Sequence, residues 1–256
     1  MNNRSFVKHI LKTFIGAVMM GIILTLLRNY NQEGMILIIT ASSVFFIFFL
    51  NVIIDRKQKN TLIPEQYFKN IEEKKLPKSV RGYLLIESIT AKILYYNSNE
   101  VNSHLIQKRH YNYIILTSAA LQQMNTAETA ALIFHEIGHI KGNHAKKKRI
   151  YCNLRNTAYV AFIGLCSCFS ITLSLSLLET IIFFFINIEL FIWGGHLLLC
   201  WLLRNQEYEA DKFAVIHCKR ESLVSALDKT NKCFTKSIYS SHPNVLQRIN
   251  RIHSYA

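Results

Sequence analysis

Four apolar stretches, each long enough to cross a lipid bilayer as a helix, limit what this chain can fold into. They cover residues 10–27, 35–54, 158–178 and 180–203. A helix needs roughly 17 to 25 residues to span the hydrocarbon core. Charged residues make up 18% of the 256-residue chain, against about 25% in typical soluble domains. The sequence therefore predicts an integral membrane protein with four transmembrane helices.

The first stretch has a second interpretation, a cleaved signal peptide, because Lys12 lies near its start. We reject cleavage, since the stretch ends in Thr25-Leu26-Leu27-Arg28 without a small-x-small site. A second apolar stretch also follows after only a few residues, as it does in a helical hairpin. We therefore expect a transmembrane hairpin at residues 1–54.

Basic residues are unevenly spread over the connecting segments. Three Lys or Arg residues lie in 1–12, sixteen in 55–152 and nine in 204–256, whereas Arg28 alone lies between the first two stretches. Cytoplasmic loops of membrane proteins carry this excess. We expect both termini and the central region to face the cytoplasm, in a bacterial inner membrane. The net charge of +14 is then explained by contact of basic residues with the anionic membrane leaflet. Nucleic acid is not an expected partner, because the sequence contains no recognisable nucleic-acid-binding motif.

The central region shows both strand and helix patterns. Residues 86–96 and 111–116 are rich in Ile, Leu and Tyr and are separated by polar turns, which predicts a small antiparallel sheet or hairpin. Asn125 followed by Glu128 has the spacing of a capping box. A proline-free helix is expected to follow over 126–148.

That helix contains His135-Glu136-Ile137-Gly138-His139. Residues four apart share a helix face, so both imidazoles can hold one zinc ion while Glu136 takes a proton from the water that zinc activates. The alternative is that two histidines share a face by chance in a satisfied core.

A catalytic zinc site needs a third protein ligand, and the segment Glu207-Tyr208-Glu209-Ala210-Asp211 offers one. Glu207 and Asp211 are four apart, so Glu207 can bind the metal while Asp211 hydrogen-bonds the distal nitrogen of a ligand histidine. Glu209 is expected to point elsewhere, into solvent.

Two further groups of residues leave alternatives open. His242, in the turn Ser241-His242-Pro243-Asn244, can donate to an oxyanion, and Arg248 can hold Asp211 or His242. A capping histidine and a surface arginine would look the same. Glu189 and His196 fall on the face of Glu207 and Asp211 if residues 180–214 form one helix. They either line a wet cleft or form a buried pair.

Three motifs, in this order, resemble those of the HtpX-like membrane zinc metallopeptidases, the gluzincin family that also includes the CAAX prenyl proteases. They are HEIGH at 135–139, EYEAD at 207–211 and SHPNVLQRI at 241–249. The segment 113–121 resembles the strand and turn before the zinc helix, and Asn102 lies near the upstream asparagine of the family. The resemblance implies metal binding by His135, His139 and Glu207, with Glu136 as catalytic base.

The resulting fold class is a mainly α-helical membrane protein with a cytoplasmic zincin-type α+β catalytic domain. We expect a catalytic region at 55–154, a second transmembrane hairpin at 155–203 and cytoplasmic helices at 204–256. The resemblance implies a zinc endopeptidase with one Zn²⁺ per chain, acting on misfolded or membrane proteins at the cytoplasmic face. The lipid bilayer is a further expected partner, and the sequence leaves open whether the chain forms a homo-oligomer. The alternatives are a proteolytically silent metal-binding scaffold and, more remotely, a CAAX-type prenyl protease.

Overall fold

The computed structural model describes residues 18, 69–70, 76–87, 89–107, 111–173, 175–230, 240 and 242–255. The expected spans at 10–27 and 35–54 lie outside these residues, apart from residue 18. The chain divides into two compact units, which we describe separately. Among the described residues, one unit holds the sheet and the short helices, and the other holds residues 18, 150–173 and 175–198.

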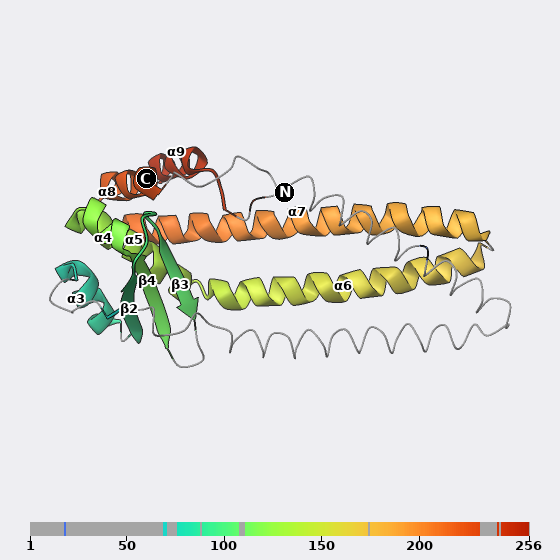
Figure 1. Cartoon of the computed structure of the whole chain (residues 1–256), viewed down its shortest axis with the longest axis horizontal. Helices are drawn as coiled ribbons and strands as arrows, with labels where there is room; N and C mark the ends of the chain where they lie inside the picture. Colours follow the sequence, from blue (N-terminus) through green and yellow to red (C-terminus); the bar gives the residue numbers. More distant parts are fainter. Residues whose placement is uncertain are drawn as a thin grey trace. The chain divides into compact units, whose positions relative to one another are not determined.

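The sheet has four strands in the order β1-β2-β4-β3. Their bounds are Lys69–Asn70 for β1, Ala91–Tyr96 for β2, Ser103–Gln107 for β3 and Asn112–Thr117 for β4. β2 runs parallel to β4, whereas β3 is antiparallel to β4 (Figure 1). β4 is the most buried strand, which agrees with its interior position.

The expected antiparallel pairing of 86–96 with 111–116 is wrong. The polar segment between them contains a strand of its own, β3, which pairs with one edge of β4, and β2 lies at the other edge of β4 and runs parallel to it. Ile86 belongs to a helix, α3 (Lys78–Ile86), and not to the strand. Short-range alternation indicated the strands but could not fix their order.

Helices cover the sheet and form one core with it. Besides α3 they are α4 (Ser118–Gln123), α5 (Thr126–Lys141), α8 (Arg220–Thr230) and α9 (Val245–Ser254). The core includes fully buried side chains from β4, α5, α8 and α9, namely Ile114, Leu116, Ile133, Ile137, Leu223 and Ile252. Burying an aliphatic side chain of this size contributes roughly 1.5 to 3 kcal/mol. The core therefore fixes α5, which carries the HEIGH motif, against its neighbours.

The start of α5 confirms the expected capping box. The Asn125 side chain accepts a hydrogen bond from the Glu128 amide at 2.9 Å, and the Glu128 side chain accepts one from the Asn125 amide at 2.8 Å. The helix does not run to residue 148, however. It ends at Lys141, because Asn143 adopts the left-handed conformation with φ of 53°. A new helix, α6 (His144–Thr172), begins at the next residue.

α6 and α7 (Leu177–His217) are the two longest helices among the described residues, and residues of both form a small apolar cluster in the second unit. Cys166, Phe184 and Ile188 are buried there, and Phe162 stacks on Phe191 at 4.4 Å between ring centroids. α7 has 41 residues and contains the whole expected span 180–203, which confirms that 180–214 is a single helix.

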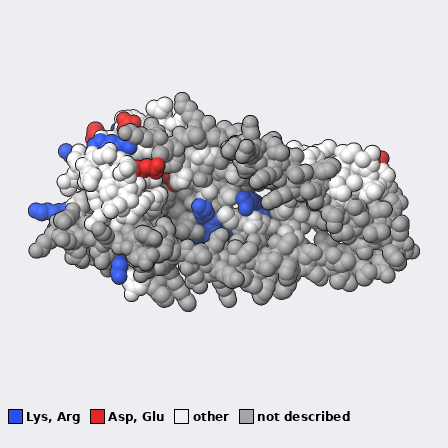
Figure 2. Space-filling model, viewed as in Figure 1, with Lys and Arg blue, Asp and Glu red and all other residues white. Residues whose placement is uncertain are grey.

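Among the described residues, α7 is the one helix that is long and apolar enough to cross a membrane. The expected third span, 158–178, is interrupted because α6 ends at Thr172 and α7 begins at Leu177. The described residues thus contain one candidate transmembrane helix and do not establish the expected four. In Figure 2 the described surface near the turn between α6 and α7 is almost free of charged side chains.

Candidate metal centre

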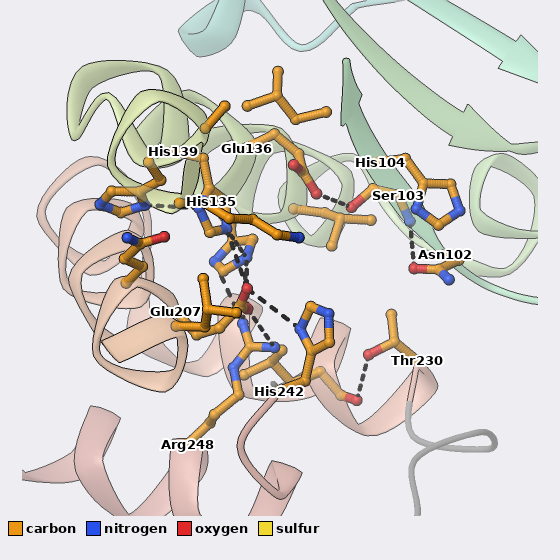
Figure 3. A pocket seen from close by; sticks show the side chains of 18 residues that line it. Asn102, Ser103, His104, His135, Glu136, His139, Glu207, Thr230, His242 and Arg248 are labelled. Carbon is orange, nitrogen blue, oxygen red and sulfur yellow. Dashed lines mark hydrogen bonds and ion pairs between the residues drawn. The ribbon is translucent and has the colours of Figure 1, made fainter. Parts of the chain in front are cut away.

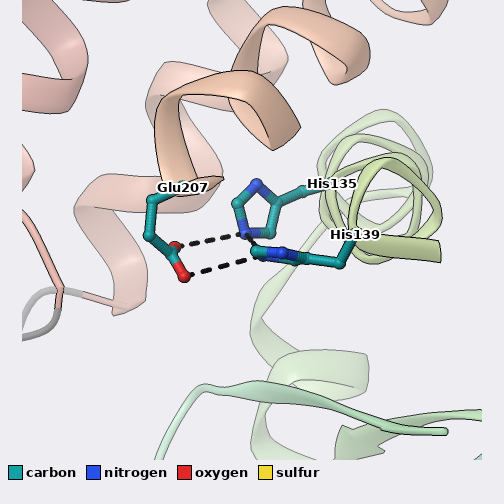
Figure 4. A group of neighbouring side chains, drawn as sticks. All are labelled: His135, His139 and Glu207. Atoms are coloured by element: carbon teal, nitrogen blue, oxygen red, sulfur yellow. Dashed lines mark hydrogen bonds and ion pairs between the residues drawn. The ribbon is translucent and has the colours of Figure 1, made fainter. Parts of the chain in front are cut away.

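The side chains of His135, His139 and Glu207 converge in the unit that holds the sheet. Their candidate ligand atoms all lie within 4.8 Å of one another. α5 contributes both imidazoles from successive turns, and α7 contributes the carboxylate, which faces both rings (Figure 4). The two Nε2 atoms are 3.2 Å apart, and each lies 3.6 Å from a carboxylate oxygen of Glu207.

This arrangement fits a zinc ion. Zinc bound at about 2.0 to 2.1 Å in tetrahedral geometry sets two imidazole nitrogens roughly 3.3 Å apart, close to the observed spacing of 3.2 Å. Two nitrogens and one carboxylate are also a donor set that catalytic zinc sites use, with a position left for solvent or substrate. The two nitrogens face each other directly, a contact that a cation relieves.

A buried carboxylate and guanidinium support the first histidine. Asp211 Oδ1 lies 3.0 Å from His135 Nδ1, and Arg248 donates to both Asp211 oxygens at 2.8 and 2.6 Å. Arg248 Nη2 is also 3.3 Å from His135 Nδ1. A guanidinium only donates, so the Nδ1 proton goes to Asp211 and leaves Nε2 free to bind metal. The expected contact of Arg248 with Asp211 is present.

The charges around His135 shift the pKa values of the group strongly. Burial and the charge of Arg248 act to lower the pKa of His135, but hydrogen bonds to Asp211 and Glu207 outweigh them and raise it to about 9. Burial and the nearby His135 lower the pKa of His139 to about 3. Burial would raise the pKa of Glu207, but its contacts with His135, His242 and Arg248 hold it well below the usual range. Glu207 is thus ionised beside the two imidazoles.

Glu136 lies next to the three candidate ligands and on the side of the sheet. Its Oε1 accepts a hydrogen bond of 2.5 Å from the Ser103 hydroxyl at the start of β3 (Figure 3). Both residues line the same cavity as the candidate ligands. Sequence reasoning missed Ser103, because no local pattern shows that β3 and α5 bring it to Glu136.

His242 lies on the other side of the site, in the loop before α9. Its Nδ1 is 3.3 Å from Glu207 Oε1, and half of the side chain is exposed. The Asn244 side chain caps α9 by accepting from the Leu246 amide at 3.2 Å, so His242 does not cap this helix. His242 is therefore available to the cavity, where it also contacts Glu207 (Figure 3).

The second histidine, His139, has a support that the sequence did not predict. His139 Nδ1 lies 2.7 Å from His144 Nδ1, and His144 Nε2 lies 3.0 Å from Glu209 Oε2. The expectation that Glu209 points into solvent is wrong in part: its side chain is 58% exposed, but its carboxylate contacts His144 and lies 3.4 Å from Lys147 Nζ. The turn at Asn143 brings His144 back towards α5, and the sequence pattern did not predict this turn.

The cavity over these residues has a volume of about 290 Å³. β3, α5, the start of α6, α7 and the loop before α9 contribute to it. Its polar lining residues include Asn102, Ser103, His104, Glu136, Lys148, Glu207, His242 and Arg248. Glu189 and His196 do not line it. The Trp193 indole, four residues further along α7, donates to Glu189 Oε2 at 3.0 Å.

Comparisons with known proteins agree with this geometry. The model of the peptidase family M48 matches residues 91–256, which is more than half of the chain and includes all the site residues above. No curated protein matches in sequence. A crystal structure of S. mikatae Ste24p matches with a TM-score of 0.60 and 19% identity, over 93% of this chain and 66% of that chain. This likeness concerns the fold, and the chain spans just under two thirds of that relative. The chain therefore belongs to peptidase family M48, a family of metallopeptidases.

Proposed function

We propose that the chain is a membrane-bound zinc endopeptidase that holds one zinc ion per chain. Its substrates are membrane or misfolded proteins, cleaved at the cytoplasmic face. The observation that carries the proposal is the convergence of His135, His139 and Glu207, with Glu136 lining the same cavity. Family membership supports the reaction class, and the likeness to Ste24p adds support for the fold alone.

The chemistry divides between the ion and the side chains. When bound, zinc polarises the peptide carbonyl and makes water more acidic. Glu136 takes a proton from water as the water oxygen attacks the carbonyl carbon, and it then delivers that proton to the leaving amide nitrogen. The Ser103 hydroxyl holds Glu136 in place before the reaction. His242 donates to the oxyanion that forms at the carbonyl oxygen.

The substrate binds along β3 in this proposal. β4 (Asn112–Thr117) is an interior strand of the sheet, so a peptide cannot add to it. β3 is an edge strand of the described sheet, and residues 102–105 line the cavity. An extended peptide can add to this edge through backbone hydrogen bonds, which gives affinity with little sequence preference.

Membrane attachment is supported by α7 and by the exposed side chains of its unit. Only 11% of the apolar window of α7 is buried, although the window contains few charges. Large apolar side chains on α6 and α7 are exposed, including Leu165, Phe169, Ile182, Ile186, Leu190 and Leu198. Many exposed apolar side chains on two helices are typical of a lipid-facing surface. The excess of basic residues in the connectors supports a site on the cytoplasmic side. A homo-oligomer and the wet cleft at Glu189 and His196 remain further proposals.

The test is protein cleavage by detergent-purified chain, stripped with chelator and reloaded with zinc. Wild type, Glu136→Gln and the surface control Glu221→Gln are compared on casein. Wild type and the control should cleave with about one zinc per chain, while Glu136→Gln should bind zinc and lose about 10² to 10⁴-fold in rate. Zinc without cleavage in wild type would favour the silent scaffold, and a chain without zinc would refute the proposal.

A further inference from the structure

The contacts behind His139 form a chain of three side chains that reaches the surface. His144 is almost fully buried, with 3% of the residue exposed, and it lies between His139 at 2.7 Å and Glu209 at 3.0 Å. Glu209 lies on α7 between Glu207 and Asp211. One turn of α7 therefore contacts both histidines of the HEIGH motif, directly or through His144.

The backbone around His144 is adapted to this contact. A Cβ atom on Gly142 would lie 2.1 Å from His144 Nε2 and 2.6 Å from its Cδ2, so the ring occupies space that only glycine leaves. Asn143 then takes a left-handed conformation with φ of 53°. These two residues end α5 and start α6 with the His144 ring turned back onto His139.

The hydrogen bonds along the chain agree in direction once a metal is bound. His139 uses Nε2 as the ligand, so its Nδ1 carries the proton and donates to His144 Nδ1. His144 Nε2 then carries a proton and donates to Glu209 Oε2. Each nitrogen has one role, and the negative charge lies at the far end on Glu209.

We propose that His144 and Glu209 act as a positioning relay, which fixes the tautomer and ring orientation of His139 for metal binding. Glu209 supports the second ligand through His144, as Asp211 supports the first directly. The inference rests on the proposed zinc site. Partners of this kind typically change metal affinity 10- to 100-fold when they are removed.

A purely structural role for His144 makes a different prediction. If the ring only fills space beneath the α5–α6 turn, removal of the Glu209 carboxylate should leave zinc binding unchanged, because the Glu209 side chain is 58% exposed. If the relay operates, the effect of Glu209 depends on His144. The losses of zinc affinity caused by the two single substitutions should then be non-additive in the double variant.

The experiment measures zinc affinity by chelator competition on the full chain in detergent. The variants are Glu209→Gln, His144→Leu and the double variant. Glu221→Gln is the control for loss of an exposed carboxylate. His217→Leu is the control for loss of an imidazole on α7, since that ring contacts Phe134 and Phe213 outside the cavity. Visible spectra of the cobalt-loaded proteins report the ligand geometry independently of activity.

The relay predicts about tenfold weaker zinc binding for Glu209→Gln and about 10- to 100-fold for His144→Leu. The double variant should bind no more weakly than His144→Leu alone, and both controls should stay within about twofold of wild type. The cobalt spectra of the relay variants should differ from the wild-type spectrum.

Zinc affinities within about twofold of wild type, or additive losses in the double variant, would overturn the relay. If His144→Leu fails to fold, Glu209→Gln alone decides, since its side chain is half exposed. If wild type binds zinc and cleaves casein, and Glu209→Gln binds zinc equally well, the relay is refuted and the proposed function stands. If wild type does not bind zinc, both the relay and the proposed function are refuted.

Discussion

Gly138 of the HEIGH motif sets how closely the two helices of the metal centre approach. A Cβ atom at this position would lie 2.9 Å from Ala210 Cα and 3.1 Å from Phe213 Cβ, both on α7. Non-bonded carbon atoms normally stay about 3.5 to 4.0 Å apart. In Gly138→Ala, α5 and α7 must therefore separate by about 0.6 to 1 Å, because a backbone atom cannot rotate away.

The consequence should be larger for metal binding than for stability. Alanine gains about 1 kcal/mol of helix propensity over glycine, which offsets part of an overpacking cost of about 1 to 3 kcal/mol. Metal–ligand distances, in contrast, tolerate changes of only about 0.2 Å. The separation draws Glu207 away from both histidines, so we expect about 10- to 100-fold weaker zinc binding.

The assay is chelator competition for zinc together with thermal unfolding in detergent, with and without zinc. Gly82→Ala is the matched control, because Gly82 lies in α3 and a Cβ there meets no atom within 4 Å. The control should bind zinc normally and unfold at or above the wild-type temperature. If Gly138→Ala binds zinc as tightly as Gly82→Ala, the close approach of α5 and α7 does not set the ligand geometry.

Three further outcomes follow from the contacts of the sheet-bearing unit. Burial would raise the pKa of Glu128, but hydrogen bonds from Lys229 and Ser225 lower it below 4.5. Glu128→Gln should therefore unfold more easily at neutral pH, and in acid titrations the difference from wild type should shrink as pH falls below about 4.5; a constant difference would contradict this. Arg248→Met leaves a buried carboxylate without its cation and should lower the free energy of unfolding by about 3 to 5 kcal/mol, whereas a loss under 1 kcal/mol in denaturant titration would speak against the pairing. Ser103→Ala should lower kcat for peptide hydrolysis about tenfold with zinc content unchanged, and an unchanged kcat would remove its positioning role.

The parts of the site that could be predicted from sequence are those set by local helix geometry. His135 and His139 share a face of α5, and Glu207 and Asp211 share a face of α7, because residues four apart stack in any helix. The capping box at Asn125 could also be predicted, because it too depends on a fixed spacing within one helix. The meeting of the two helices could be inferred only because a catalytic metal needs a third ligand.

The parts that could not be predicted depend on long-range contacts or on a single backbone angle. Ser103 reaches Glu136 because β3 joins the far side of β4, and strand order is not encoded in local alternation. His144 reaches His139 because Asn143 is left-handed, which turned an expected long helix into two. Of the expected membrane spans, 180–203 lies within α7, whereas the first two fall outside the described residues.

The central claim is that His135, His139 and Glu207 hold one zinc ion beside Glu136. X-ray absorption at the zinc edge of the loaded full-length protein tests it most directly. The account predicts one zinc per chain, two imidazole nitrogens at about 2.0 to 2.1 Å and further oxygen ligands at about 2.0 to 2.2 Å. Replacing Glu207 with Ala should change the oxygen contribution and leave both imidazoles. Sulfur scattering near about 2.3 Å, or a single imidazole, would contradict the ligand set.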